Sequence, residues 1–185
     1  KNRQKLRVSA MFEQSIAHAR TLLNDTAQQQ GITQKSVIII GLSGGPDSVF
    51  LLHVLHKLYT DGTINLIAAH LDHGWRIDSD KDAAFCSLLC KQMNIPLVLA
   101  HARDLSITPK NTGSQEDTGR QLRRFFFEQT LRQHDAHFIA LAHHQNDQQE
   151  TFFMRMLRGA TLDGLSCMDA VDGVYVRPLL HISKL

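Results

Sequence analysis

Short apolar runs alternate with longer amphipathic segments along most of this chain. Continuous apolar runs fall at residues 37–40, 66–69, 97–100 and 138–142. Runs without polar alternation are typical of strands that are buried on both faces of a parallel sheet. With a short fifth strand expected at residues 175–177, they predict the strands of an α/β protein.

The segments between these runs have apolar residues at helical spacing. Helices are expected over residues 12–30, 47–59 and 80–93, with further helices beginning near Glu116 and at Asn146. In the last helix, Phe153, Met156 and Leu157 are expected to pack against the core. Strands that alternate with helices through right-handed crossovers predict a doubly wound, mostly parallel sheet of about five strands flanked by helices.

Composition narrows the class of protein without identifying it. A length of 185 residues, an apolar share of 43% and a charged share of 21% fit one globular domain. The net charge of +2 is small, so any nucleic-acid binding must come from local patches. No apolar run approaches the length of about 18 residues that a membrane span needs, and no signal peptide is recognisable. A cytoplasmic protein is therefore expected.

The three cysteines form no C-x-x-C pair and leave an odd one over, which argues against a disulfide framework. Cys86 and Cys90 lie one helical turn apart on an apolar face, where cysteine packs as a small hydrophobe. We expect core thiols there. The alternative is that they are metal ligands.

A glycine-rich turn, Ser43-Gly44-Gly45-Pro46-Asp47-Ser48, joins the first strand to the next helix. Such a turn predicts an anion site, because glycines let backbone N–H groups approach a ligand at a helix N-terminus. It is neither a Walker loop, which needs a Lys, nor the dinucleotide fingerprint. Asp47 would repel phosphate unless a cation lay between them, which suggests Mg²⁺ held by Asp47 and a nucleotide. The alternative is an ordinary strand–turn–helix with serine caps.

Polar residues follow the second strand, at residues 70–76. Ligands of open α/β sheets bind at the carboxyl ends of strands, so this cluster is a candidate for the same site. His70 and His73 could be metal ligands, although no cysteine or third histidine stands nearby at a zinc spacing.

A second polar cluster, residues 143–151, follows the fourth strand. Asn146 and Gln149 have the form of a capping box, which would place Asp147 and Glu150 on one face of the first helical turn. Two carboxylates there could bind a metal, act as acid and base, or hold an ammonium group. Acidic residues also favour helix N-termini without any further role.

A third polar group is the charged start of the helix near Glu116. Glu116, Arg120 and Arg123 or Arg124 would share one helix face. The alternative interpretation is a solvated face with surface salt bridges.

The glycine turn resembles the pyrophosphate loop of the N-type PP-loop ATPases, which split ATP into AMP and pyrophosphate. Three further segments resemble the tRNA(Ile)-lysidine synthetase branch of that family. These are H-x-x-H-G-x-R at residues 70–76, E-x-x-A-R-x-x-R-Y at 116–124, and A-H-H-x-x-D-Q-x-E-T at 142–151. A fourth, R-G-x-x-x-x-G-L, is matched at 158–165. The resemblance implies a Rossmann-like fold of the adenine nucleotide alpha hydrolase type.

The chain departs from the branch pattern at four informative positions. Trp75 replaces Leu, Gly119 replaces Ala, Arg124 replaces Tyr, and Asn146 replaces Asp. We expect packing to absorb Trp75. A glycine inside a helix costs about 1 kcal/mol relative to alanine.

The resemblance implies a ligase that adenylates the C2 oxygen of the wobble cytidine in tRNA(Ile), with a CAU anticodon, and joins free L-lysine to it. It implies ATP contacts at Ser43, Gly44, Gly45, Pro46, Asp47, Ser48, His70 and His73. Asp47 would hold Mg²⁺, and Asp147 and Glu150 would hold lysine. Asp47, Arg120, Asp147 and Glu150 are the expected catalytic residues.

Two alternatives remain open. A PP-loop tRNA sulfurtransferase of the 2-thiocytidine type shares the adenylation step and often uses an iron–sulfur site. A noncatalytic nucleotide-binding module would need only the loop.

The domain limits are also an expectation. Residues 1–10 are expected to be a leader or tail that need not be ordered, with Met11 as a natural start, and residues 11–185 a single PP-loop domain. Similar R-P-L-L segments in the family lead into further domains, so the resemblance implies that this domain is a fragment.

Overall fold

The computed structural model describes residues 2–75, 79–110, 114–157, 159 and 168–183, with side chains from residue 4 onward. These residues contain a six-stranded sheet of strand order β3-β2-β1-β4-β6-β5. The strands are β1 (Val37–Gly41), β2 (Asn65–Asp72), β3 (Leu97–His101), β4 (Phe138–Ala140), β5 (Val171–Asp172) and β6 (Tyr175–Val176). All neighbours are parallel except β5 and β6. The predicted mostly parallel sheet is confirmed, and the short antiparallel β5 is an addition to it.

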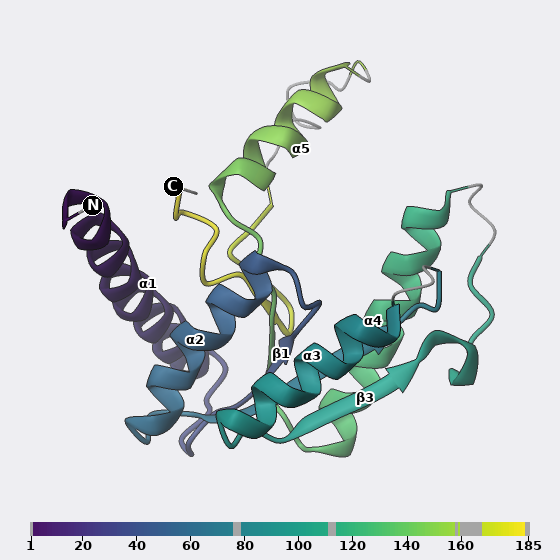
Figure 1. The fold of residues 1–185 in the computed structure, drawn as a ribbon, viewed down its shortest axis with the longest axis horizontal. Helices are drawn as coiled ribbons and strands as arrows, with labels where there is room; N and C mark the ends of the chain where they lie inside the picture. The colour runs from purple at the N-terminus through teal and green to yellow at the C-terminus, as the bar shows by residue number, and fades with distance from the viewer. Residues whose placement is uncertain (1, 76–78, 111–113, 158, 160–167, 184–185) are drawn as a thin grey trace.

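Helices cover the sheet on both sides (Figure 1). They are α1 (Asn2–Gln29), α2 (Pro46–Thr60), α3 (Ser79–Gln92), α4 (Gln115–Gln133) and α5 (Gln145–Leu157), with a 3-10 turn at Ala102–Asp104. The first helix begins at Asn2 and not near Phe12, so residues 2–10 continue α1. No described helix is long and apolar enough to cross a membrane.

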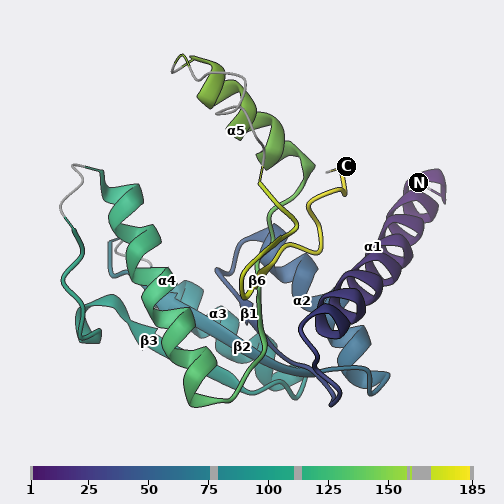
Figure 2. The same ribbon diagram turned by 180° about the vertical axis from the view of Figure 1, so that it is seen from behind.

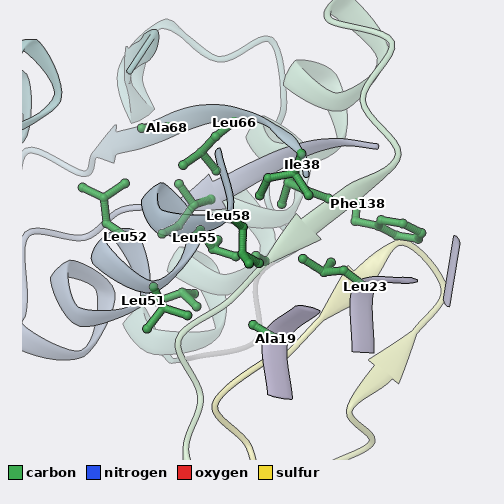
Figure 3. Close-up of a cluster of buried hydrophobic side chains, with 14 of the residues drawn as sticks. Ala19, Leu23, Ile38, Leu51, Leu52, Leu55, Leu58, Leu66, Ala68 and Phe138 are labelled. Carbon is green, nitrogen blue, oxygen red and sulfur yellow. The ribbon is translucent and has the colours of Figure 1, made fainter. Parts of the chain in front are cut away.

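The central strand β1 has a core on each of its faces. Ile38 and Ile40 belong to a buried cluster with α1, α2 and α3, part of which Figure 3 shows. Ile39 points the other way, into a cluster with Phe126 and Phe127 of α4. Burial on both faces explains why the sequence of β1 is apolar without alternation.

Helix α5 leads away from the sheet in both ribbon views (Figures 1 and 2). None of its described residues is buried. The expectation that Phe153, Met156 and Leu157 pack against the core is wrong, because their side chains are 55%, 47% and 79% exposed. The helix begins directly after β4, at the carboxyl edge of the sheet.

The order of the strands creates a crevice beside β1. The chain runs outward from β1 to β2 and β3, then returns to the other side of β1 with β4. At such a switch point the connections after two adjacent strands diverge, which leaves a ligand-binding opening at their carboxyl ends. The glycine turn follows β1 and the start of α5 follows β4.

Candidate functional site

A cleft of about 1190 Å³ opens at the carboxyl edge of the sheet. Among the predicted site residues, those that line it are Ser43, Asp47, Ser48, His70, His73, Arg120 and Asp147. The convergence of segments after β1, β2 and β4 was expected, because the carboxyl ends of parallel strands lie along one edge of the sheet. Gly44, Gly45, Pro46 and Glu150 are not among the lining residues.

The backbone of the glycine turn is fixed by residue type. Gly44 has a φ of +84°, a conformation that side chains of L-residues disfavour. Gly45 is the N-cap of α2 and Pro46 occupies the first turn, where a missing N–H removes no helical bond. The first N–H groups of a helix have no partner inside it, so α2 points its positive end at the cleft.

The two serines of the turn bond to the turn itself. Ser48 Oγ donates to the Gly45 carbonyl at 2.9 Å and accepts from the Ser43 N–H at 3.2 Å. Ser43 Oγ lies 3.0 Å from Ser48 Oγ and accepts from the Gly45 N–H at 3.3 Å. Both side chains therefore hold the turn in shape while they line the cleft.

His70 is a buried support for the turn. Its Nδ1–H donates to the carbonyl of Leu42 at 2.8 Å, directly before the glycine turn. The same ring nitrogen lies 3.5 Å from Cys86 Sγ. His70 thus anchors the end of β1 as well as facing the cleft.

Cys86 and Cys90 are buried free thiols, as expected for core positions. Burial raises the pKa of Cys86 to about 12 and that of Cys90 to about 11. Both thiols are therefore protonated and unreactive at neutral pH. Cys167, Arg76 and the segment 160–165 lie outside the described residues.

Asp147, in the first turn of α5, stabilises the start of this helix. The helix begins at Gln145, one residue before the predicted Asn146 cap, so the predicted capping box is wrong. Asp147 Oδ2 instead accepts the backbone N–H of His144 at 2.8 Å, which is the backward half of a capping box. Gln148 makes two 2.7 Å hydrogen bonds with the backbone of Met168, which tie this turn to the segment before β5.

His144 brings two carboxylates together. Its Nε2 lies 3.6 Å from Asp47 Oδ2, and its Nδ1 lies 3.3 Å from Asp147 Oδ2. The first aspartate belongs to the glycine turn and the second to α5. Asp47 and Asp147, which lie on separate segments of the sequence, therefore approach the same imidazole ring. Glu150, one turn further along α5, is exposed.

His143 was not among the predicted site residues, although it lines the cleft. Its Nδ1 is buried and has no hydrogen-bond partner among the described residues. Burial, and then the positive charge of Arg177, lower the pKa of His143. A neutral imidazole in the cleft can accept a proton from a ligand.

Arginines supply the positive charge of the cleft. Arg120, Arg123 and Arg124 line it from α4, and Arg177 lines it from the end of β6. Arg177 is largely buried, and its Nη1 donates to the carbonyl of Asp169 at 2.6 Å. Arg177 directly follows β6, and that position at the carboxyl end of a strand could have identified it as a site residue.

The metal expectation can be tested against the side chains. No group of three or more acidic, histidine or cysteine side chains able to hold a metal occurs in the described part of the chain. Mg²⁺ usually takes one or two protein carboxylates and completes its shell with water and substrate phosphates. Asp47, a partly exposed carboxylate on the cleft wall, fits a metal that arrives with a nucleotide.

The PP-loop domain family matches residues 12–185 of this sequence. The match agrees with the observed sheet topology and with the lysine-free glycine turn at its switch point. The chain belongs to the PP-loop family, which supports ATP as its nucleotide.

The sequence is similar to curated proteins named tRNA(Ile)-lysidine synthase. The one from Clostridioides difficile is 40% identical over 163 residues, which cover 86% of this chain and 35% of that protein. The one from Bacillus subtilis is 36% identical over 168 residues, covering 88% and 35%. The chain thus spans about a third of the length of these relatives.

Solved structures show the same fold at low identity. A U34-tRNA thiolase from Methanococcus maripaludis with its 4Fe–4S cluster has a TM-score of 0.73 at 18% identity, covering 95% of this chain and 61% of that one. An NH3-dependent NAD synthetase from Campylobacter jejuni has a TM-score of 0.56 at 12% identity, covering 95% and 68%. These similarities support the predicted fold and nothing narrower.

Proposed function

We propose that this chain is the adenylating domain of a tRNA(Ile)-lysidine synthase. It would use ATP to activate the C2 oxygen of the wobble cytidine. It would then join L-lysine to C2 of the same base. The names of its curated relatives support this assignment. The structural observation that carries it is the approach of Asp47 and Asp147 to the same imidazole, because it joins a nucleotide loop to a carboxylate suited to an amine.

In the first step, the cytidine C2 oxygen attacks the α-phosphate of ATP and pyrophosphate leaves. The N–H groups at the start of α2 would hold the leaving pyrophosphate. Arg120 would offset negative charge that develops on the α-phosphate, an electrostatic contribution worth about 3 kcal/mol for comparable donors elsewhere. Asp47 would hold Mg²⁺, which would neutralise phosphate charge when bound.

In the second step, the lysine ε-amine attacks C2 and AMP leaves. An amine is mostly protonated at neutral pH, so it must lose a proton before it attacks. Asp147 would bind the ammonium form through its charge. His143, neutral because of its lowered pKa, would accept the proton. Glu150 would extend the acidic surface that lysine meets on α5.

The experiment is mass analysis of tRNA(Ile) after incubation with the complete protein, ATP, Mg²⁺ and lysine. The expected products are a wobble base carrying lysine, AMP and pyrophosphate. Formation of ADP would contradict the adenylation step. A base that gains sulfur would favour the sulfurtransferase. ATP binding without turnover would favour the noncatalytic nucleotide-binding module.

The sulfurtransferase alternative has less support from the side chains. The thiolase with the same fold is described with a 4Fe–4S cluster, which thiolate ligands normally hold. Here both described cysteines are buried, and burial raises the pKa of each thiol.

A further inference from the structure

The turn that follows β2 presents an aromatic surface to the cleft. His73 and Trp75 are stacked, with ring centroids 4.5 Å apart and an interplanar angle of 25°. Both line the cleft, and Trp75 is 43% exposed. An exposed indole on the wall of a polar cleft is unusual for packing alone, since burial would stabilise it further.

The buried carboxylate of Asp72 stabilises this turn. Asp72 Oδ1 accepts the Gly74 N–H at 2.8 Å, and Asp72 Oδ2 lies 3.1 Å from His101 Nδ1. These bonds fix the backbone between the two stacked rings. The aromatic surface is therefore preorganised.

Trp75 also packs directly against Gly119 of α4. A Cβ added to Gly119 would lie 2.7 Å from Cη2 of Trp75, closer than side chains approach, and 3.1 Å from Cζ3, so the indole would have to shift. The indole thus occupies the space that an alanine at 119 would use. The two departures from the family pattern, Trp75 for Leu and Gly119 for Ala, are therefore linked, because the indole packs where the alanine methyl group would lie.

Cationic groups stand beside the rings. Arg123 Nη1 donates to His73 Nε2 at 3.4 Å, and Arg120 and Arg124 line the same cleft. Burial, and then the charge of Arg123, lower the pKa of His73, so its ring stacks as a neutral imidazole. Aromatic faces next to arginines are the usual means by which proteins hold unstacked RNA bases and their phosphates.

We propose that Trp75 and His73 form a stacking platform for an unpaired nucleobase of the RNA substrate, with Arg123 beside it for a phosphate. The occupant follows from the proposed function, which requires an extruded cytidine and its neighbours to reach this cleft. The platform adds a base contact that a Leu at position 75 would not provide. The resemblance instead implies an ATP contact for His73, and ATP also carries a base, so the test separates the two sources.

Trp75 is the only tryptophan of the chain, so intrinsic fluorescence reports on this position directly. The 185-residue chain is titrated with a short oligocytidylate RNA, with an abasic oligomer of equal length, and with ATP and Mg²⁺. We expect quenching by the RNA and much less by the other two. Quenching by ATP alone, or equal quenching by the abasic oligomer, would overturn the proposal, as would RNA binding without any change in fluorescence. An absence of RNA binding would overturn it as well.

Variants test the contact by an independent route. Trp75→Leu should weaken RNA binding about tenfold, since stacking on an aromatic side chain contributes on that order, while Trp75→Phe keeps most of the affinity. Gly119→Ala should weaken it similarly, and the double variant Trp75→Leu/Gly119→Ala no further than Trp75→Leu. Phe153→Leu, an exposed aromatic that does not line the cleft, is the matched control. Unchanged RNA affinity in folded Trp75→Leu would refute the platform. Lysine incorporation by the wild-type complete protein tests the proposed function separately.

Discussion

Asp147 accepts the backbone N–H of His144 at 2.8 Å, so the carboxylate that we assign to lysine also begins helix α5. The two roles can be separated by substitution. Asp147→Asn keeps an oxygen acceptor for the cap but removes the charge that would hold an ammonium group. We expect Asp147→Asn to fold with nearly unchanged stability and to lose most lysine incorporation, measured with labelled lysine.

Asp147→Ala should lose both roles. Loss of a hydrogen bond costs about 1 kcal/mol, so urea unfolding should show this loss for the alanine variant and not for the asparagine variant. Adenylation, followed by release of pyrophosphate, should continue in both. Full lysine incorporation by Asp147→Asn would contradict the assignment.

Gly44→Ala should damage the nucleotide site through the backbone. Alanine at a φ of +84° costs about 1–2 kcal/mol, and relief of that strain would move the N–H groups of the turn. We expect the dissociation constant for ATP, measured by calorimetry, to rise at least about tenfold. Gly62→Ala is the matched control, because Gly62 has a φ of +75° in the turn between α2 and β2, away from the cleft. An equal loss of ATP binding in Gly62→Ala would show that the effect is general destabilisation.

The buried thiols should resist modification in the folded protein. In a Cys167→Ser background, Cys86 and Cys90 have pKa values raised to about 12 and about 11 by burial. A disulfide reagent at pH 8 should therefore react with neither until urea unfolds the chain. The extent of reaction is measured by the absorbance of the thiol that the reagent releases. Rapid labelling without denaturant would mean that the thiols are accessible.

His143 should make stability depend on pH. Its pKa is lowered in the folded protein by burial and by Arg177, whereas in the unfolded chain it is near the ordinary value of 6.5. As the pH falls through about 6.5, the unfolded state binds a proton that the folded state binds only at lower pH. The stability present above that pH is therefore lost below it. Urea unfolding from pH 7.5 to 5 should show a shallower decline for His143→Gln than for the wild type, and equal slopes would contradict the prediction.

Sequence reasoning predicted the strands of the sheet better than the start of α5. Apolar runs such as 37–40 can be recognised locally, because a strand buried on both faces is apolar at every position, whichever residues cover it. The cap of α5 was misassigned because two overlapping boxes fit the same residues. Asn146 with Gln149 and His144 with Asp147 have equal spacing, and only the path of the chain after β4 selects the second.

The site was predictable where residues follow a strand and not where it depends on contacts between segments. Ser43, Asp47, Arg120 and Asp147 were expected in one cleft and line it. The role of His144, which approaches both Asp47 and Asp147, was not predicted although the motif at 142–151 contains this residue, because the role depends on the distance between the starts of α2 and α5. The packing of Trp75 on Gly119 is likewise invisible in a sequence that separates them by more than one helix.

The strand that carries the glycine turn has a parallel neighbour on each side, β2 and β4. Amide hydrogens of such a central strand exchange with solvent mainly when the whole molecule opens. We therefore expect the nucleotide loop to follow a slowly exchanging strand, while the short β5–β6 hairpin at the sheet edge can fray independently. Loss of ATP binding in a heated or denaturant-treated sample will accordingly follow global unfolding and not loosening of that edge.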